Sequence, residues 1–334
     1  MVFRPLLLGL ALVAAGLCAG AARADGLPVL GIDVGNTGVT TPRVRYVTLP
    51  LQGNTLVAQV EREGGSVLQR RALRGRFTIP AVAFDGSADG LSADGHTLVV
   101  IRPRIAFPRA ETAFAVLAAD RLRLRALVTL RGDFSFDALS PDGSLLYLIE
   151  YLSPRDPTRY QVRVYDAKAG RLLPDPIVDP SEADEAMRGS PLTRVSSPDG
   201  RWEYTLYDGG GKTPFVHALD TVGRTASCID LDALSLLIGS DMSQLRMRRR
   251  DHSLVIDAGG SPLVRIDTRT FAVHEPAPAS VVTPAASAEP DRGGWWIPVV
   301  TALVLAAILA LAIFRRRPRL ARPWRSRSSA TPNR

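Results

Sequence analysis

Residues 208–214, with the sequence DGGGKTP, contain the Gly-Lys-Thr triplet that ends a phosphate-binding loop. Such a loop surrounds phosphate oxygens with backbone N–H groups, and its lysine balances their charge. The motif also needs a glycine five positions before Gly211, where this sequence has Leu206, and Pro214 stands where a phosphate-facing helix should continue. We therefore predict a hairpin loop between a strand at 202–207 and the strand that follows Pro214.

A second phosphate-like stretch is GIDVGNT at residues 31–37, which resembles the strand and turn of actin-like sugar and pantothenate kinases. No further phosphate motif follows it. Export of the chain would also separate this stretch from cytosolic nucleotide. The stretch runs into a repeat turn at Thr41-Pro42, so we expect residues 29–34 to form a strand that closes a ring of sheets, because an open ring exposes strand edges.

The four histidines share no spacing that is typical of a metal site. His96 and His252 follow turn residues and are expected at the surface, whereas His217 is expected to be buried and hydrogen-bonded. His274 stands alone near the end of the repeats. Convergence of distant repeats on one metal stays open, but no local catalytic signature appears, and the sequence indicates no cofactor and no metal site.

Cys228 is the only cysteine beyond the N-terminal block, since the other of the two is Cys18. An intrachain disulfide is therefore excluded after cleavage of that block. Cys228 adjoins Ile229, and no histidine is suggested nearby, so we expect a buried small hydrophobic residue rather than a nucleophile. The acidic residues 179–191 lack the spacing and the glycine of an EF-hand, and a calcium site there is the minor interpretation.

The two ends of the chain indicate export and anchoring. Residues 1–24 combine Arg4, an apolar run and a small-x-small site before Asp25, which predicts a signal peptide; a retained membrane helix is the alternative. Residues 295–314, from Trp295 to Phe314, are uncharged and long enough to cross a bilayer of about 30 Å. The basic tail at 315–334 should stay cytoplasmic. We expect a single-pass cell-membrane protein whose N-terminal domain is extracytoplasmic.

The net charge of +8 does not describe the exported body. Of the 41 Lys and Arg residues, 2 lie in the leader and 8 in the tail, which leaves 31 against 33 acidic residues. The body is therefore close to neutral, and no nucleic-acid partner is expected. The cluster RMRRRD at 246–251 is interpreted as a solvated strand or loop face.

Repeated turns organise residues 25–275. Three Ser-x-Asp-Gly tetrapeptides each precede a run rich in β-branched, aromatic and leucine residues. In such a turn the Asp side chain bonds the backbone and Gly accepts a positive φ, so that one strand can reverse into the next. The turn pairs are Asp94 and Gly95, Asp142 and Gly143, and Asp199 and Gly200.

Two degenerate copies, at Thr41-Pro42 and Arg250-Asp251, extend the series. The steps between the second residues of the five turns are 51, 48, 57 and 52 residues. A period near 50 with several strands per period is the spacing of propeller blades.

The SPDG turns, together with VYDAKAG and RIDTRT, resemble the bacterial YVTN-type, TolB-like and WD40-like β-propellers over roughly residues 27–273. The resemblance implies an all-β fold, a β-propeller with about five detectable blades and five to seven possible. The transmembrane helix predicted at residues 295–314 follows it in the chain. Residues 276–294, rich in Pro, Ala and Ser, cannot bury a core and are expected to form an extended linker.

Two functions remain open at this point. The first is an extracytoplasmic binding module for a protein, peptide or glycan, with Trp202 and Tyr151 as candidate anchors if they are exposed. Core packing is the alternative role of both rings. The second function is a lactonase-like propeller hydrolase with metal or acid–base groups in the central channel, for which Asp33, Asp85 and Asp137 are candidates. Catalytic residues are otherwise unknown.

Overall fold

The computed structural model describes residues 38–182 and 187–275. The predicted signal peptide, closing strand, linker, membrane segment and basic tail lie outside these ranges. Within them, no helix has the length and apolarity needed to cross a bilayer.

The described residues form five antiparallel sheets that follow one another along the chain. Four sheets have four strands and the second has three. The strands are β1 (Val39–Thr40), β2 (Val44–Leu51), β3 (Asn54–Glu61) and β4 (Val67–Leu73); β5 (Thr97–Ile101), β6 (Glu111–Ala118) and β7 (Arg123–Arg131); β8 (Phe134–Leu139), β9 (Leu145–Tyr151), β10 (Tyr160–Asp166) and β11 (Arg171–Leu172); β12 (Pro191–Ser196), β13 (Trp202–Tyr207), β14 (Phe215–Asp220) and β15 (Thr225–Asp230); β16 (Leu245–Arg250), β17 (Ser253–Ala258), β18 (Ser261–Asp267) and β19 (Val273–His274). Two short 3-10 helices, η1 (Gly209–Gly211) and η2 (Asp232–Leu237), join the later strands.

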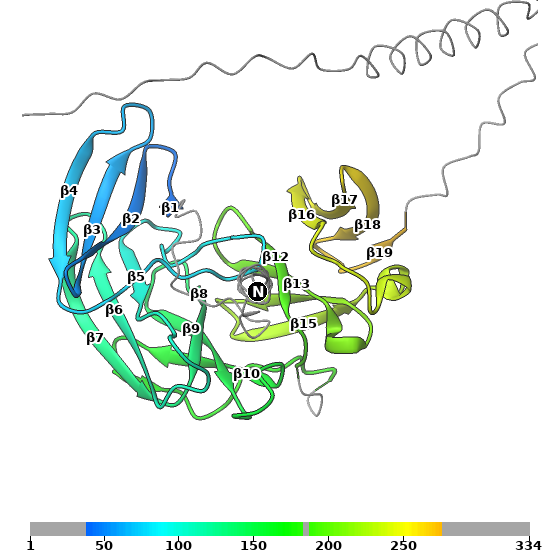
Figure 1. Cartoon of the computed structure of the whole chain (residues 1–334). Coiled ribbons are helices and arrows are strands. Elements are labelled where there is room, and N and C mark those ends of the chain that lie inside the picture. The colour runs from blue at the N-terminus through cyan, green and yellow to red at the C-terminus, as the bar shows by residue number, and fades with distance from the viewer. Residues whose placement is uncertain (1–37, 183–186, 276–334) are drawn as a thin grey trace, which may run out of the picture. The chain divides into compact units, whose positions relative to one another are not determined.

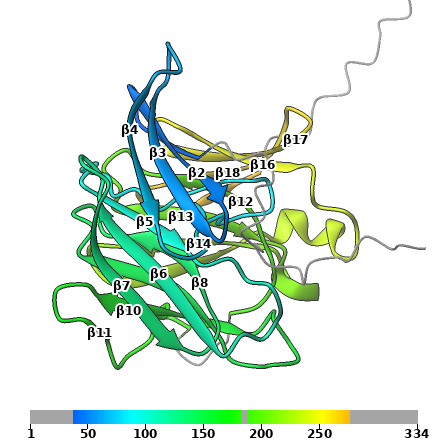
Figure 2. The ribbon, with the colours of Figure 1, turned by 60° about the vertical axis from the view of Figure 1, so that its left-hand side comes forward.

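Within each sheet, every strand pairs with its neighbour in sequence. Figure 1 shows the sheets set in chain order around a common centre, and Figure 2 shows the same arrangement after a 60° turn. Up-and-down sheets arranged radially are the blades of a propeller. The expectation of an all-β, propeller-type fold is therefore confirmed for the described residues.

The five repeat turns occupy equivalent places. Those of the first, third, fourth and fifth sheets join the first strand to the second. In the second sheet the first strand is reduced to isolated bridges, of which Leu91↔Leu98 sits directly before the turn into β5. One period of about 50 residues in the sequence therefore corresponds to one sheet in the structure.

The three Ser-x-Asp-Gly turns share one hydrogen-bond pattern. In each, the serine hydroxyl donates to the Asp carboxylate, and the hydroxyl oxygen accepts a backbone N–H five residues later. The Asp also accepts the backbone N–H two residues on. The glycine has a φ of 73°, 66° or 68° in the successive turns, a conformation that glycine adopts without strain.

The apolar core lies between successive sheets. One cluster of buried side chains fills each of the four spaces from the first sheet to the fifth. The described residues contribute no comparable cluster between the fifth and first sheets. Burial on both faces explains why the central strands are nearly continuous apolar runs; β5, for example, is buried at all five positions.

Local predictions agree with these elements. The DGGGKTP stretch forms η1 and its flanks between β13 and β14, where Asp208 caps the turn by accepting the N–H of Gly210 at 2.9 Å. Residues 246–250 belong to β16, with Arg248, Arg249 and Arg250 exposed, as expected of a solvated face.

Candidate functional site

A pocket of about 340 Å³ lies between the third and fourth sheets. Its walls come from β10, from the connection after β11, from the η1 loop, and from β14 and β15. The lining combines apolar side chains such as Ile177, Met187 and Phe215 with acids, a thiol and an imidazole. Mostly apolar concave sites with a few convergent polar groups are typical of ligand binding.

The hairpin of β14 and β15 places a histidine opposite a cysteine. His217 and Cys228 are Cα partners in the antiparallel register, so their side chains project from the same face of the sheet. Residues two apart on a strand also share a face, which brings Asp230 to the same wall. Cys228 is half-buried rather than fully buried.

His217 is only 2 % exposed, and neither of its ring nitrogens has a hydrogen-bond partner. Its expected burial is confirmed, whereas its expected hydrogen bond is absent. Burial lowers the pKa of His217 to about 4, because the imidazolium would lose its hydration. The ring is therefore neutral at pH 7 and has a lone pair available. Its edge packs against Tyr207, with ring centroids 6.4 Å apart.

Asp179 reaches the same wall from the connection after β11. Its Oδ2 accepts the backbone N–H of Cys228 at 2.7 Å, and its Oδ1 accepts the N–H and hydroxyl of Ser181 at 2.8 and 2.6 Å. Although burial opposes ionisation, these bonds together hold the pKa of Asp179 below its usual value. The carboxylate is thus charged and fixed in orientation.

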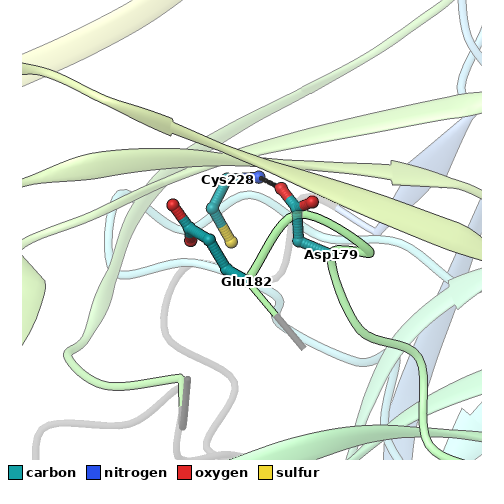
Figure 3. A group of neighbouring side chains, drawn as sticks. All are labelled: Asp179, Glu182 and Cys228. Atoms are coloured by element: carbon teal, nitrogen blue, oxygen red, sulfur yellow. Dashed lines mark hydrogen bonds between the residues drawn. The ribbon is translucent and has the colours of Figure 1, made fainter. Parts of the chain in front are cut away.

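Glu182 completes the group. One carboxylate oxygen each from Asp179 and Glu182 and the Cys228 sulfur all lie within 4.8 Å of one another. Figure 3 shows the carboxylates of Glu182 and Asp179 on either side of Cys228, with the hydrogen bond from Cys228 to Asp179 drawn as a dashed line. The arrangement can bind a cation, and its thiol can act as a soft ligand.

The sequence alone does not bring these residues together. The acids of 179–191 and the thiol lie far apart in the chain, and no histidine was predicted near Cys228. The pairing of His217 with Cys228 could have been predicted from the hairpin. A register that places Asp220 opposite Thr225 across the turn also places His217 opposite Cys228. The contact with Asp179 carries no such local signal.

A second group of charges lies on the inner strands. Arg194 of β12 is bound by the carboxylate and backbone carbonyl of Asp137 from β8, and its guanidinium lies 3.9 Å from Asp89. Glu203 of β13 accepts the Ser196 hydroxyl at 2.6 Å. Burial, followed by the Asp89 charge, raises the pKa of Glu203 to about 8. The group joins the second, third and fourth sheets.

Of the three channel carboxylates predicted from sequence, the two that the structure describes lie in different environments. Asp137 belongs to the buried charge group, whereas Asp85 is exposed in a loop and bonds Ser87. Asp33 lies outside the described residues. His96, His252 and His274 are exposed, and none of them lines the pocket between the third and fourth sheets.

Both candidate anchors are half-buried and engaged by neighbours. Trp202 stacks on Tyr204, with ring centroids 6.2 Å apart, and meets Phe271 edge-on at 5.4 Å. Tyr151 donates to or accepts from Ser135 at 2.8 Å and lies under the Arg104 guanidinium, 4.7 Å from the ring centroid. Neither ring lines the pocket between the third and fourth sheets.

The class defined by these observations is an all-β protein of propeller type. No family model and no curated protein matches the chain. Solved structures similar to it include TolB from Acinetobacter baumannii, at 14% identity and a TM-score of 0.40. That match covers 73% of this chain, which spans 55% of the TolB chain.

Two further matches have comparable scores. A putative TolB from Agrobacterium tumefaciens matches at 15% identity and a TM-score of 0.35, with 69% of this chain and 76% of that chain covered. A Mycobacterium tuberculosis puromycin-hydrolyzing peptidase matches at 18% identity and a TM-score of 0.36. The match covers 72% of this chain and 38% of the peptidase chain. At such low sequence identities and TM-scores, these similarities do not indicate the family or the function of the chain.

Proposed function

We propose that this protein is a single-pass, membrane-anchored binding module, with its propeller outside the cytoplasm, that takes part of a peptide into the pocket between the third and fourth sheets. The signal-like residues 1–24 and the apolar residues 295–314 with their basic tail support the anchoring. The pocket supports the binding role.

The observation that carries the proposal is the composition of that pocket. Its volume of about 340 Å³ lies near the lower end of the roughly 300–1,000 Å³ of ligand sites. Aliphatic and aromatic walls accept an apolar side chain without leaving polar groups unpaired, whereas the many hydroxyls of a glycan would lose hydration there. A peptide therefore fits the lining better than a sugar does.

The acids favour a peptide that also carries a positive charge. Asp179, Glu182 and Asp230 give the lining three carboxylates, against the two cationic side chains of Lys212 and Arg188. A lysine or arginine next to an apolar residue would match both the carboxylates and the apolar wall.

A hydrolase with acid–base groups in the channel is the second candidate. Glu203 favours it, because a carboxyl with a pKa of about 8 stays protonated at neutral pH and can donate a proton. Hydrolysis that disappears in Glu203→Gln with folding unchanged would support this candidate.

Val178 lines the pocket and is 39% exposed, so a larger side chain there should block the mouth. Full-length protein in detergent is probed with a library of short peptides, comparing the wild type with Val178→Trp and Val222→Trp. Val222 is 57% exposed in the turn at the opposite end of β14 and β15 and serves as the matched control.

We expect peptides rich in basic and apolar residues to bind the wild type and Val222→Trp, and to be lost from Val178→Trp. An identical peptide set bound by all three proteins would place binding elsewhere and would reject the proposal.

A further inference from the structure

We infer that the pocket between the third and fourth sheets also binds a divalent transition metal of the zinc class. Asp179, Glu182 and Cys228 supply three ligands. His217 lines the same pocket but lies outside this group of atoms, and its ring would turn toward the metal as the fourth ligand. The inference deepens the proposed function, on which it rests for the role of the pocket as a binding site.

The three ligand atoms are close to the spacing that a metal requires. They lie within 4.8 Å of one another, whereas tetrahedral zinc with bonds of about 2.0–2.3 Å places its ligands about 3.3–3.8 Å apart. Small rotations of the Cys228 and Glu182 side chains would close this difference. Asp179 does not need to move, because Ser181 and the Cys228 N–H already orient its carboxylate.

The buried imidazole is an independent sign of a ligand. A polar group held in the interior without a partner destabilises the fold, because it loses its hydration and gains no hydrogen bond. Both His217 nitrogens are nevertheless unpartnered at 2 % exposure. His217 lines the same pocket and lies opposite Cys228 in the hairpin. A bond from one nitrogen to a metal would satisfy the ring.

The donor set selects the metal. Calcium and magnesium prefer sites made wholly of oxygen, whereas a thiolate with imidazole and carboxylates suits zinc and cobalt. Binding requires loss of the Cys228 thiol proton to solvent, so the sulfur donates to the metal as a thiolate and affinity rises with pH.

Cobalt provides a direct test, because a thiolate bound to Co²⁺ gives a charge-transfer band in the near ultraviolet. Full-length protein in detergent is first treated with a chelator, checked for loss of metal, and then titrated with Co²⁺ and with Zn²⁺. Any thiolate band must come from Cys228 once the predicted leader is removed, since the only other cysteine, Cys18, lies in that leader.

We expect one Co²⁺ per chain with a thiolate band that Zn²⁺ displaces, and protection of Cys228 from alkylation by Zn²⁺. Cys228→Ser should abolish the band, and Asp179→Asn and His217→Asn should each weaken zinc binding by at least about 10-fold. Asp230→Asn, which removes a charge from the same lining but no proposed ligand, should change affinity less than Asp179→Asn.

Absence of the band in the wild type, or equal zinc affinity in the wild type and Cys228→Ser, would overturn the metal site. The wild type alone also decides the question, because Cys228 that is alkylated equally fast with and without Zn²⁺ would likewise overturn the metal site. Peptide binding that persists after chelation would leave the proposed function intact, whereas metal binding without any peptide would reject that function alone.

Discussion

Glu203 shows how a single buried carboxyl can set the pH dependence of stability. Its side chain faces Ser196, Arg194 and the carboxylates of Asp89 and Asp137, and its pKa is raised to about 8 from an ordinary value of 4.5. Between these values the folded protein binds a proton that the unfolded chain releases. The contribution of Glu203 to stability is therefore complete below pH 4.5 and is lost as the pH rises through 8.

We predict that the wild type loses on the order of 2 kcal/mol of unfolding free energy relative to Glu203→Gln between pH 5 and 7. Urea unfolding of full-length protein at several pH values measures this difference. Glu111→Gln, the same chemical change at an exposed position of β6, should track the wild type throughout. A Glu203→Gln curve parallel to that of the wild type would contradict the assignment.

At the scale of elements, the turns connect neighbouring sheets as well as neighbouring strands. The Asp94 N–H donates to the carbonyl of Pro141 at 3.0 Å, so the turns of the second and third sheets touch. A Cβ on Gly143 would meet the Thr97 side chain at 2.4 Å, whereas a Cβ on Gly95 would meet nothing within 4 Å. Both glycines have a positive φ, and only Gly143 is also packed.

We predict that Gly95→Ala costs about 1 kcal/mol through backbone strain alone. Gly143→Ala should cost about 1–3 kcal/mol more, because the added methyl group forces the second and third sheets apart. The midpoints of denaturant unfolding of the two variants provide the comparison. Equal losses would show that this contact between turns adds nothing to stability.

Features that depend on local chemistry could be predicted from the sequence. The Asp-Gly turns, the strands that follow them and the glycine hairpin after β13 each depend on residues within about ten positions. The serine of each turn was part of the motif, but its role as both donor and acceptor was not inferred. The second sheet replaces its first strand with isolated bridges, and no turn signal marks that change.

The pocket could be predicted only in part. Register across one hairpin could have paired His217 with Cys228, but Asp179 meets Cys228 across 49 residues of sequence, through the packing of one sheet on the next. The burial of Tyr151 under Arg104 likewise depends on the contact between the second and third sheets. Composition and spacing carry no information about such contacts.

At the scale of the whole molecule, the proposal requires the propeller and the tail to lie on opposite sides of a membrane. Positive residues resist translocation, so the arginines after residue 314 should hold the C-terminus in the cytoplasm. A reporter enzyme that is active only outside the cytoplasm should be active when fused after Glu275 and inactive when fused after Arg334. The reverse pattern would contradict the orientation.

The central claim is that the pocket between the third and fourth sheets meets a peptide outside the cytoplasm. Photo-crosslinking in intact cells tests it most directly, with a photoreactive residue replacing Val178 at the pocket or Val222 at the far turn of the same hairpin. We predict a discrete crosslinked product from Val178 that is absent from Val222 and is competed by basic, apolar peptides. The same products from both positions, or none from Val178, would contradict the claim.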